Sequence, residues 1–344
     1  MNSKSLVFSH QRDVVIELSR YFDKVEVFTT ETSSEFLPKN VKVFYLPWKV
    51  HSPLQNVLTI LKLLYPTLIK SRTSVLFTHM TDIHASIVAP LTWLLRMRHV
   101  LWYAHANNSR YLIFSSFFVS NIVSSTYGSC KLKLNRGKIR YINQGISHTD
   151  FFYRVRTHQK LYKILYYGRL DPSKNIHLFP RLINELKRYQ NSYTLTLFGR
   201  PSNVTAEKYL LDLKSLQKFS SEESLITLNG PIERALIADI AKNYDIFVNL
   251  FSGSLDKTLI EATFMGMPVV TWNREYCSEF GTWSGLGVSE NLEFIINEFK
   301  AIESLKGSEL NRRINKRLQV ARKSHSFEGW INQLVGVLKE GKSW

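Results

Sequence analysis

Residues 252–270, SGSLDKTLIEATFMGMPVV, combine small, charged and acidic side chains at spacings that suit chemistry. The pattern predicts a loop of small residues, a short helix and a strand. Small residues at a helix start leave N–H groups and the positive end of the helix dipole open to a ligand, which suits phosphate. Asp256 and Lys257 lie at this start, and Glu261 follows one turn later. Because the neighbours of Glu261 are apolar, we expect it to be partly buried rather than on a solvated face.

A second candidate group follows the apolar run 163–167, in the sequence KILYYGRLDPSKN. Arg169 offers a planar fork of donors, and Lys174, five residues later, offers a mobile point charge. After Gly168 both side chains could converge on one diphosphate. Taken alone, the segment also fits a turn with solvated basic residues, since short motif matches are common. The loop at 252–258 favours the diphosphate interpretation.

The first half of the chain must position such groups on alternating strands and helices. Apolar runs and helical spacings predict strands at 5–10, 24–30, 41–48, 74–80, 99–106 and 139–146, and helices at 13–22, 52–71 and 82–97. Pro66 is expected to end or kink the second of these helices. Strands alternating with helices of this length indicate right-handed crossovers and a mostly parallel sheet.

The alternation restarts after a polar, basic stretch at 147–160, which we interpret as a linker. Strands are predicted at 162–169, 193–200, 224–230 and 245–250, and helices at 177–189 and 234–243. The fold class is therefore α/β, with two doubly wound domains. Ligands of such sheets bind beyond the carboxyl ends of the strands, where both candidate groups lie.

Composition sets outer limits. The 344 residues carry a formal net charge of +17, and 44% of them are hydrophobic, so we expect a globular, basic protein. This charge attracts nucleotides, phospholipid surfaces or nucleic acid without choosing among them. Two distant cysteines, Cys130 and Cys277, exclude a disulfide framework and fit a reducing compartment. The apolar runs are too short for a signal peptide or a membrane span.

Several segments, in order and at the expected spacing, resemble one known family. They are YYGRLDPSKNI, LTLFG, LITLNGPI, the stretch from 240 to 270, and the terminal HSFEGWINQLVGVL. Together they resemble family 4 of the retaining glycosyltransferases with the GT-B fold. The resemblance covers 162–271 and the tail, and it is weak before residue 140. It implies two Rossmann-like domains facing a cleft: an acceptor domain at 1–155, with the helix at about 326–344 packing back on it, and a nucleotide-sugar domain at 156–325.

The resemblance also implies roles for single residues. Arg169 and Lys174 correspond to the pair that grips the nucleotide diphosphate, and Glu261 to the glutamate that holds the ribose hydroxyls. His105, in WYAHANNS, corresponds to a histidine near the donor sugar. The catalytic set is thus His105, Arg169, Lys174 and Glu261. The expected donor-binding residues are Gly168, Arg169, Lys174, Gly230, Ile232, Gly253, Ser254, Leu255, Asp256, Lys257, Thr258 and Glu261.

Two positions depart from the family pattern. The family has a second glutamate eight residues before Glu261, where this chain has Gly253, and Asp256 or Lys257 is a candidate for its function. The family's glycine-rich turn after the first strand is replaced by SHQRD at 9–13, so His10, Gln11 and Arg12 are candidates for facing the cleft.

The expected reaction transfers a sugar from a UDP- or GDP-sugar with retention of configuration. The diphosphate leaving group would be stabilised by basic residues and a helix start. We expect no metal, because no Asp-x-Asp cluster is present, and no cofactor besides the donor substrate. The resemblance implies a front-face reaction, and hinge motion is expected near 147–160.

The acceptor is expected to be a glycan or a polyprenyl-linked glycan of bacterial surface polysaccharide synthesis, by family analogy alone. The apolar helix at 52–71 and the basic stretch KLKLNRGKIR at 131–140 are candidates for contact with an anionic membrane. A core helix and a solvated basic loop explain the same residues, and both interpretations stay open. The expected location is cytoplasmic, peripheral on the inner face of the cytoplasmic membrane.

Two other classes of protein remain as alternatives. One is a nucleotide-sugar epimerase or phosphorylase on a similar fold, which product analysis would separate. The other is a nucleic-acid-binding protein, suggested by charge. Against it, the sequence lacks an RNA-recognition signature and dense arginine–aromatic interleaving, so no nucleic-acid partner is expected.

Overall fold

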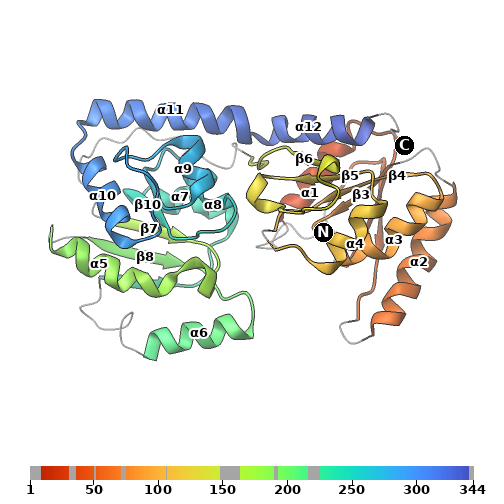
Figure 1. Cartoon of the computed structure of the whole chain (residues 1–344), viewed down its shortest axis with the longest axis horizontal. Helices are drawn as coiled ribbons and strands as arrows, with labels where there is room; N and C mark the ends of the chain where they lie inside the picture. The colour runs from red at the N-terminus through yellow and green to blue at the C-terminus, as the bar shows by residue number, and fades with distance from the viewer. Residues whose placement is uncertain are drawn as a thin grey trace. The chain divides into compact units, whose positions relative to one another are not determined.

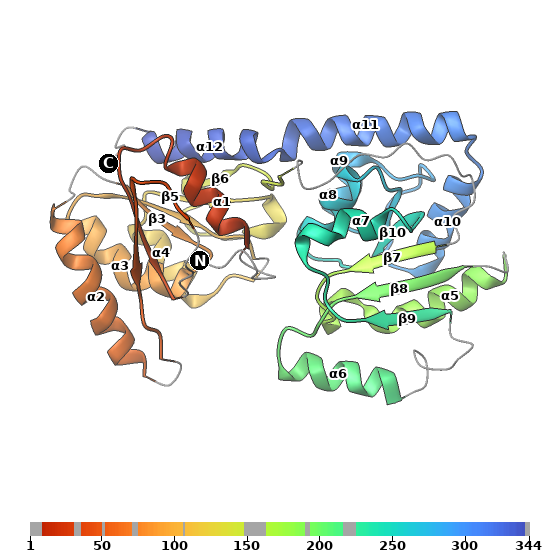
Figure 2. The same ribbon diagram turned by 180° about the vertical axis from the view of Figure 1, so that it is seen from behind.

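The structure, a computed structural model, describes residues 9–30, 36–49, 52–70, 75–105, 107–147, 163–189, 193–215 and 225–340. The chain forms two compact units (Figures 1 and 2). Unit 1 comprises Met1–Asn143 and Glu328–Trp344, and unit 2 comprises Gln144–Phe327. The predicted boundary at 155 and most of the predicted linker fall in 148–162, outside the described residues, and stay predictions.

Unit 1 contains a parallel sheet with helices on both faces. Its order is β3-β4-β5-β6, and a separate parallel pair is formed by β1 and β2. Along β4, Leu101 packs with α3 and α4, whereas the ring of Trp102 lies 5.1 Å from that of Trp330 in α12. The elements are α1 (Ser9–Leu18), β1 (Val25–Thr29), β2 (Val41–Tyr45), α2 (Pro53–Lys70), β3 (Val75–His79), α3 (Asp82–Leu94), β4 (Arg98–Trp102), α4 (Arg110–Phe118), β5 (Asn121–Ser124), β6 (Ile139–Tyr141) and α12 (Phe327–Lys339).

Unit 2 contains a five-stranded parallel sheet that is covered on both faces. Alternate residues of its central strand enter two cores: Ile164 and Tyr166 pack with α5 and α10, and Leu165 and Tyr167 pack with α7 and α8. Burial on both faces explains why these strands read as continuous apolar runs. The elements are β7 (Lys163–Tyr167), α5 (Phe179–Lys187), β8 (Thr194–Phe198), α6 (Val204–Ser215), β9 (Ile226–Asn229), α7 (Ile237–Ala241), β10 (Ile246–Asn249), α8 (Lys257–Phe264), β11 (Val269–Thr271), α9 (Arg274–Phe280), α10 (Leu292–Glu303) and α11 (Gly307–His325).

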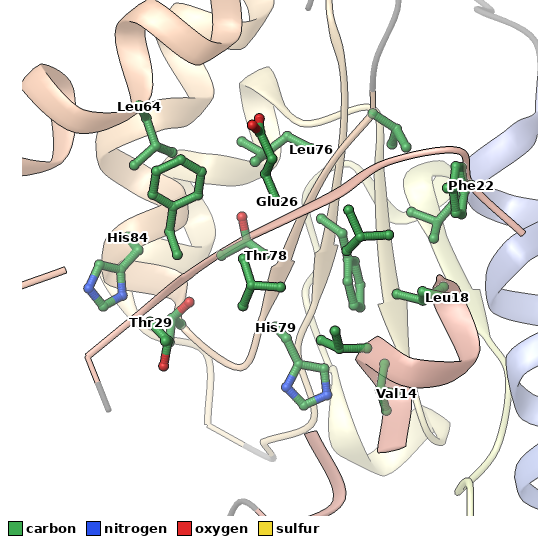
Figure 3. A pocket seen from close by; sticks show the side chains of 18 of the residues that line it. Val14, Leu18, Phe22, Glu26, Thr29, Leu64, Leu76, Thr78, His79 and His84 are labelled. Atoms are coloured by element: carbon green, nitrogen blue, oxygen red, sulfur yellow. The ribbon is translucent and has the colours of Figure 1, made fainter. Parts of the chain in front are cut away.

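A cavity of about 1080 Å³ lies between β1 and β3 in unit 1 (Figure 3). It is lined by consecutive residues of both strands, 25–30 and 75–80, and by Val14 and Leu18 of α1. A strand presents alternate residues on a face but consecutive residues along its edge, so the hydrogen-bonding edges of both strands face this cavity. An opening of this kind suits a further strand, and we assign it no ligand. Residues 5–8 of the strand predicted at 5–10 lie outside the described residues, so that part of it stays a prediction.

Several predictions for unit 1 are wrong in detail. Ser9 and His10 begin α1 rather than ending a strand, so SHQRD is not a turn. Within that helix Gln11 lies 3.2 Å from the ring of His79, and Arg12 donates to the carbonyl of Phe36. Pro66 does not end α2, which continues to Lys70, and α4 and β5 lie where the sequence predicted neither a helix nor a strand.

His99 in β4 should make unit 1 sensitive to acid. It is fully buried between two threonines. The Thr92 hydroxyl donates to Ala89 O and therefore accepts from Nδ1–H at 3.2 Å, which leaves Nε2 to accept from Thr78 at 2.8 Å. This arrangement fits a neutral ring, and burial lowers the pKa of His99 from 6.5 to about 3.

Between about pH 6.5 and 3, His99 is therefore protonated in the unfolded chain but neutral in the folded chain. As the pH is lowered through that window, the free energy of unfolding should therefore fall. This residue contributes up to about 1.4 kcal/mol per pH unit to the decrease. Urea titrations at several pH values should show a shallower slope for His99→Gln than for the wild type. The exposed His177→Gln is the control, and an unchanged slope for His99→Gln would refute the assignment.

Candidate active site

The strand order of unit 2 places the candidate site at the centre of its sheet. The order is β11-β10-β7-β8-β9, so the chain runs outward from β7 in one direction and from β10 in the other. Parallel sheets bind ligands beyond the carboxyl ends of the strands at such a switch point. The segments that leave β7 and β10 there, 168–175 and 250–256, are the two that carry the predicted phosphate-binding residues.

The turn after β7 lies against the start of α8, at Gly168 and Thr258. Tyr167 Oη donates to the carbonyl of Thr258 at 3.3 Å. A Cβ built at Gly168 would lie 3.9 Å from the Thr258 methyl group, and the φ of Gly168 is +147°, which side-chain-bearing residues rarely adopt. The φ of Gly168, rather than its distance to α8, therefore favours a glycine in this turn.

Arg169 is the accessible cation of the site. Its side chain is 59% exposed, and Nη1 lies 3.4 Å from Oδ2 of Asp171. Asp171 itself is buried and accepts a hydrogen bond from the backbone of Ser202. The carboxylate can orient the guanidinium while most of its donors stay open to a ligand.

Lys174, in contrast, is buried and already paired. Its ammonium lies 2.6 Å from Oδ2 of Asp256, with the two side chains 6% and 12% exposed, and 3.6 Å from the centroid of the Phe251 ring. Asn249 Nδ2 donates to the same oxygen at 3.0 Å. Burial opposes ionisation of Asp256, but Lys174 and these hydrogen bonds outweigh it and lower its pKa.

Asp256 is also the N-cap of α8, because its side chain accepts from the N–H of Thr258 at 3.3 Å. The N–H of Leu255 donates to Glu275 at 2.6 Å. The expectation that this helix start is open to phosphate is therefore wrong for these two N–H groups. The site holds fewer unshared positive charges than its sequence indicates.

The loop before α8 is braced by residues that the sequence analysis missed. Asn273 donates to three of its carbonyls, those of Phe251, Gly253 and Ser254, at 3.0–3.2 Å. Gln144 donates to the carbonyl of Leu255 at 3.1 Å. Asn273 carried one signal, a helix N-cap before Arg274, but nothing in the sequence linked it to this loop.

Gly253 occupies the position of the family's missing glutamate for a steric reason. A Cβ built there would lie only 2.1 Å from the Phe251 ring, so no larger residue fits without moving that ring. The Lys174 ammonium lies over the same ring, 3.6 Å from its centroid. Phe251 and Asp256 thus both contact Lys174.

Glu261 is buried, as expected, and has partners that the sequence did not reveal. It is 4% exposed, and Oε1 accepts from Nη1 of Arg234 at 3.3 Å. Burial raises the pKa of Glu261, while Arg234 and Lys257 act in the opposite direction. Arg234 follows Gly230 by four residues and was not among the predicted site residues.

The remaining predicted donor residues lie in the same unit. Gly230 follows β9, and a side chain built there would meet nothing within 4 Å, so this stretch of backbone is open. Ile232 is partly buried against the core that contains α8. Lys257 is the first residue of α8, and the Thr258 hydroxyl accepts from Asn249 at 3.1 Å.

His105 belongs to unit 1 and lies after β4, as expected from the sequence. It is exposed, and its ring packs against that of Tyr103 with centroids 5.4 Å apart. It is thus the one predicted catalytic residue outside unit 2. Among the described parts of the chain, no group of three or more histidine, cysteine, aspartate or glutamate side chains could hold a metal. No helix there is long and apolar enough to span a bilayer.

Comparison with solved structures identifies the fold. The chain is similar to HepE of Anabaena in complex with UDP and glucose, at 14% identity over 99% of this chain and 98% of that one, with a TM-score of 0.74. The chain is also similar to a glycosyltransferase of Rickettsia africae, at 13% identity over 98% of this chain and 95% of that one, with a TM-score of 0.74. For the lipopolysaccharide outer core galactosyltransferase WaaB the identity is 12% over 98% of each chain, and the TM-score is 0.64. The chain spans only 58% of TarM, another similar structure.

The two doubly wound units and these similarities define a GT-B fold, as predicted. Residues 162–301, which contain the switch-point site, match the family described as Glycosyl transferases group 1. This match confirms the resemblance at the level of that family model. Membership of family 4 is untested and stays a prediction. No match was found among curated protein sequences.

Proposed function

We propose that the protein is a retaining glycosyltransferase that uses a UDP-sugar. The observation that carries the proposal is the placement of an exposed arginine and a buried glutamate around the β7–β10 switch point. Arg169 would bind the diphosphate, and Glu261, held by Arg234, would accept from the ribose hydroxyls. The UDP in HepE structures supports UDP over GDP.

In the proposed reaction the sugar leaves the diphosphate and joins an acceptor hydroxyl on the same face. Arg169 stabilises the charge that develops on the leaving diphosphate, whereas Lys174 stays paired with Asp256. A donor phosphate oxygen takes the proton of the acceptor hydroxyl. His105 would contact the donor sugar. The transferred group is a hexose, and the acceptor is a glycan or lipid-linked glycan of bacterial surface polysaccharide synthesis, met at the inner face of the cytoplasmic membrane.

The direct test is product analysis. UDP-glucose and related donors are incubated with the protein and with candidate glycan acceptors, and the anomeric configuration of the product is read by NMR. A new glycoside with the donor's configuration supports the proposal, and an inverted one refutes retention. Conversion of the donor to another nucleotide sugar, or its phosphorolysis, would favour the alternative enzymes.

Replacing Arg169 should separate diphosphate from nucleoside recognition. Loss of a charge-assisted contact costs about 1.5–3 kcal/mol, so Arg169→Ala should lower the affinity for UDP about 10- to 150-fold. The affinity for uridine should stay almost unchanged, and calorimetric titrations measure both. The surface Arg188→Ala, 73% exposed and paired with Glu185, is the matched control and should bind like the wild type. Equal losses for UDP and uridine would count against the diphosphate assignment.

Sugar transfer should also survive chelation. In the proposal the leaving diphosphate is stabilised by basic side chains, so EDTA should leave initial rates within experimental error. Loss of turnover on chelation that Mn²⁺ or Mg²⁺ restores would overturn metal independence.

A further inference from the structure

Helix α2 of unit 1 has two apolar faces, and only one of them is covered. Ile60, Leu64 and Leu68 enter the core of the unit. On the other side, Leu54 is 79% exposed and Leu58 67%. Tyr65 and Ile69 continue this side at 49% and 37% exposure.

These exposed residues form a continuous stripe. Spacings of four, seven and four residues return to the same side of a helix, and Lys62 falls on the same line. We call Leu54, Leu58, Lys62, Tyr65 and Ile69 the outer face of α2. In both views α2 lies at the outside of its unit (Figures 1 and 2). Single exposed apolar residues are ordinary, but a stripe along four turns indicates a partner.

Charge indicates the nature of this partner. The helix contains Lys62 and Lys70 and no acidic residue. Over 36–149 the chain has fourteen lysines and arginines and a single acidic residue, Asp82, which accepts from Ser109. An apolar helix face within so basic a region is complementary to an interface of apolar chains and anionic headgroups.

We propose that the outer face of α2 inserts into the headgroup region of an anionic membrane. The leucines and Ile69 would enter the acyl boundary, Tyr65 would lie at headgroup level, and Lys62 would extend to the phosphates. The inference deepens the proposed function, on which it rests for its purpose, because a lipid-linked acceptor is found at such a surface. Its geometry is independent of the donor site.

The basic stretch at 131–140 is less available than its sequence indicates. Lys138 donates to the carbonyls of Ser116 and Phe117, and Arg140 donates to that of Gly137. Because these two side chains hold backbone carbonyls in place, neutralising them would test folding as much as membrane contact. The outer face of α2 is the sharper target, since its side chains are already exposed.

The test is co-sedimentation of the full chain with vesicles of phosphatidylcholine alone or mixed with phosphatidylglycerol. The wild type should bind the mixed vesicles, and more weakly at high salt. Leu54→Ser combined with Leu58→Ser should reduce binding about 10-fold or more, because two large apolar side chains no longer enter the interface. The matched control is Val204→Ser with Leu211→Ser in α6, 78% and 64% exposed, which should bind like the wild type.

Unchanged vesicle binding by the α2 variant, or no binding by the wild type, would overturn the inference. A loss of dimer by the α2 variant in sedimentation velocity, with vesicle binding unchanged, would assign the face to a second copy of the chain instead. UDP titration of the same samples separates the two proposals. Failure to bind UDP with intact, face-dependent vesicle binding would refute the proposed function and leave this inference standing.

Discussion

Replacing Lys174 by methionine is expected to lower the free energy of unfolding by about 3–5 kcal/mol. The reason is the Asp256 carboxylate, which would remain 12% exposed without its ammonium partner at 2.6 Å. Removing one member of a buried pair leaves an uncompensated charge, and this costs more than the pair itself contributes. Chemical denaturation followed by fluorescence measures the effect.

A second variant and a surface pair sharpen this test. Lys174→Met combined with Asp256→Asn should be more stable than Lys174→Met alone, because asparagine removes the stranded charge and still caps α8. Lys242→Met breaks an exposed pair with Asp239, 43% and 65% exposed, and should cost less than about 1 kcal/mol. Strictly additive losses in the double variant would show that the two charges do not act as a pair.

Glu261→Gln is expected to weaken UDP binding about 10- to 150-fold, as the loss of a charge-assisted hydrogen bond of about 1.5–3 kcal/mol. The amide keeps the size and one oxygen, which can still accept from Arg234 at the present 3.3 Å. It loses the charge and presents a donor where a ribose hydroxyl must donate. Melting temperature without ligand should change little, because the amide oxygen still accepts from Arg234 and the substitution removes a charge that burial already disfavours.

Two controls separate recognition from folding for Glu261. A 2′,3′-dideoxy nucleotide should bind the wild type and the variant almost equally. Glu298→Gln alters another buried carboxylate, which accepts from the backbone of Trp283 and Ser284, and should lower stability while UDP affinity stays normal. If the dideoxy nucleotide distinguishes Glu261→Gln as strongly as UDP does, the residue is structural.

The raised pKa of Glu261 gives this site a pH signature. Burial makes the ionised form less favourable, so the residue takes up a proton at a higher pH than an ordinary glutamate. If the ionised form accepts from the ribose, affinity for UDP-glucose should be full above this pKa and should fall as the pH drops through it. The affinity of Glu261→Gln should be flat over the same window.

Much of the α/β alternation was predictable from the sequence because the strands are buried on both faces. The runs at 163–167 and 246–249 read as continuous apolar segments for that reason, and each ends in the residues of the site. The region around α4 was not predictable by the same rule. Its sequence RYLIFSSFF is apolar at both buried and exposed positions, such as Leu112 and Phe117, and shows no clear period.

Within the site, residue types were easier to predict than their partners. The position of Arg169 after a strand was readable because strand ends face the ligand edge. The pairing of Lys174 with Asp256 joins residues 82 positions apart, and no local pattern encodes it. The same holds for Asn273, which braces a loop 19–22 residues away, and for the ring of Phe251, which explains Gly253. These contacts depend on which strands are neighbours in the sheet.

A crystal structure of the chain with UDP tests the central claim most directly. We predict the ribose hydroxyls within hydrogen-bond distance of Glu261, the diphosphate on Arg169 beside the turn after β7, and the base near the backbone at Gly230 and Ile232. Nucleotide bound elsewhere in the chain, or at this site with its ribose away from Glu261, would contradict the account.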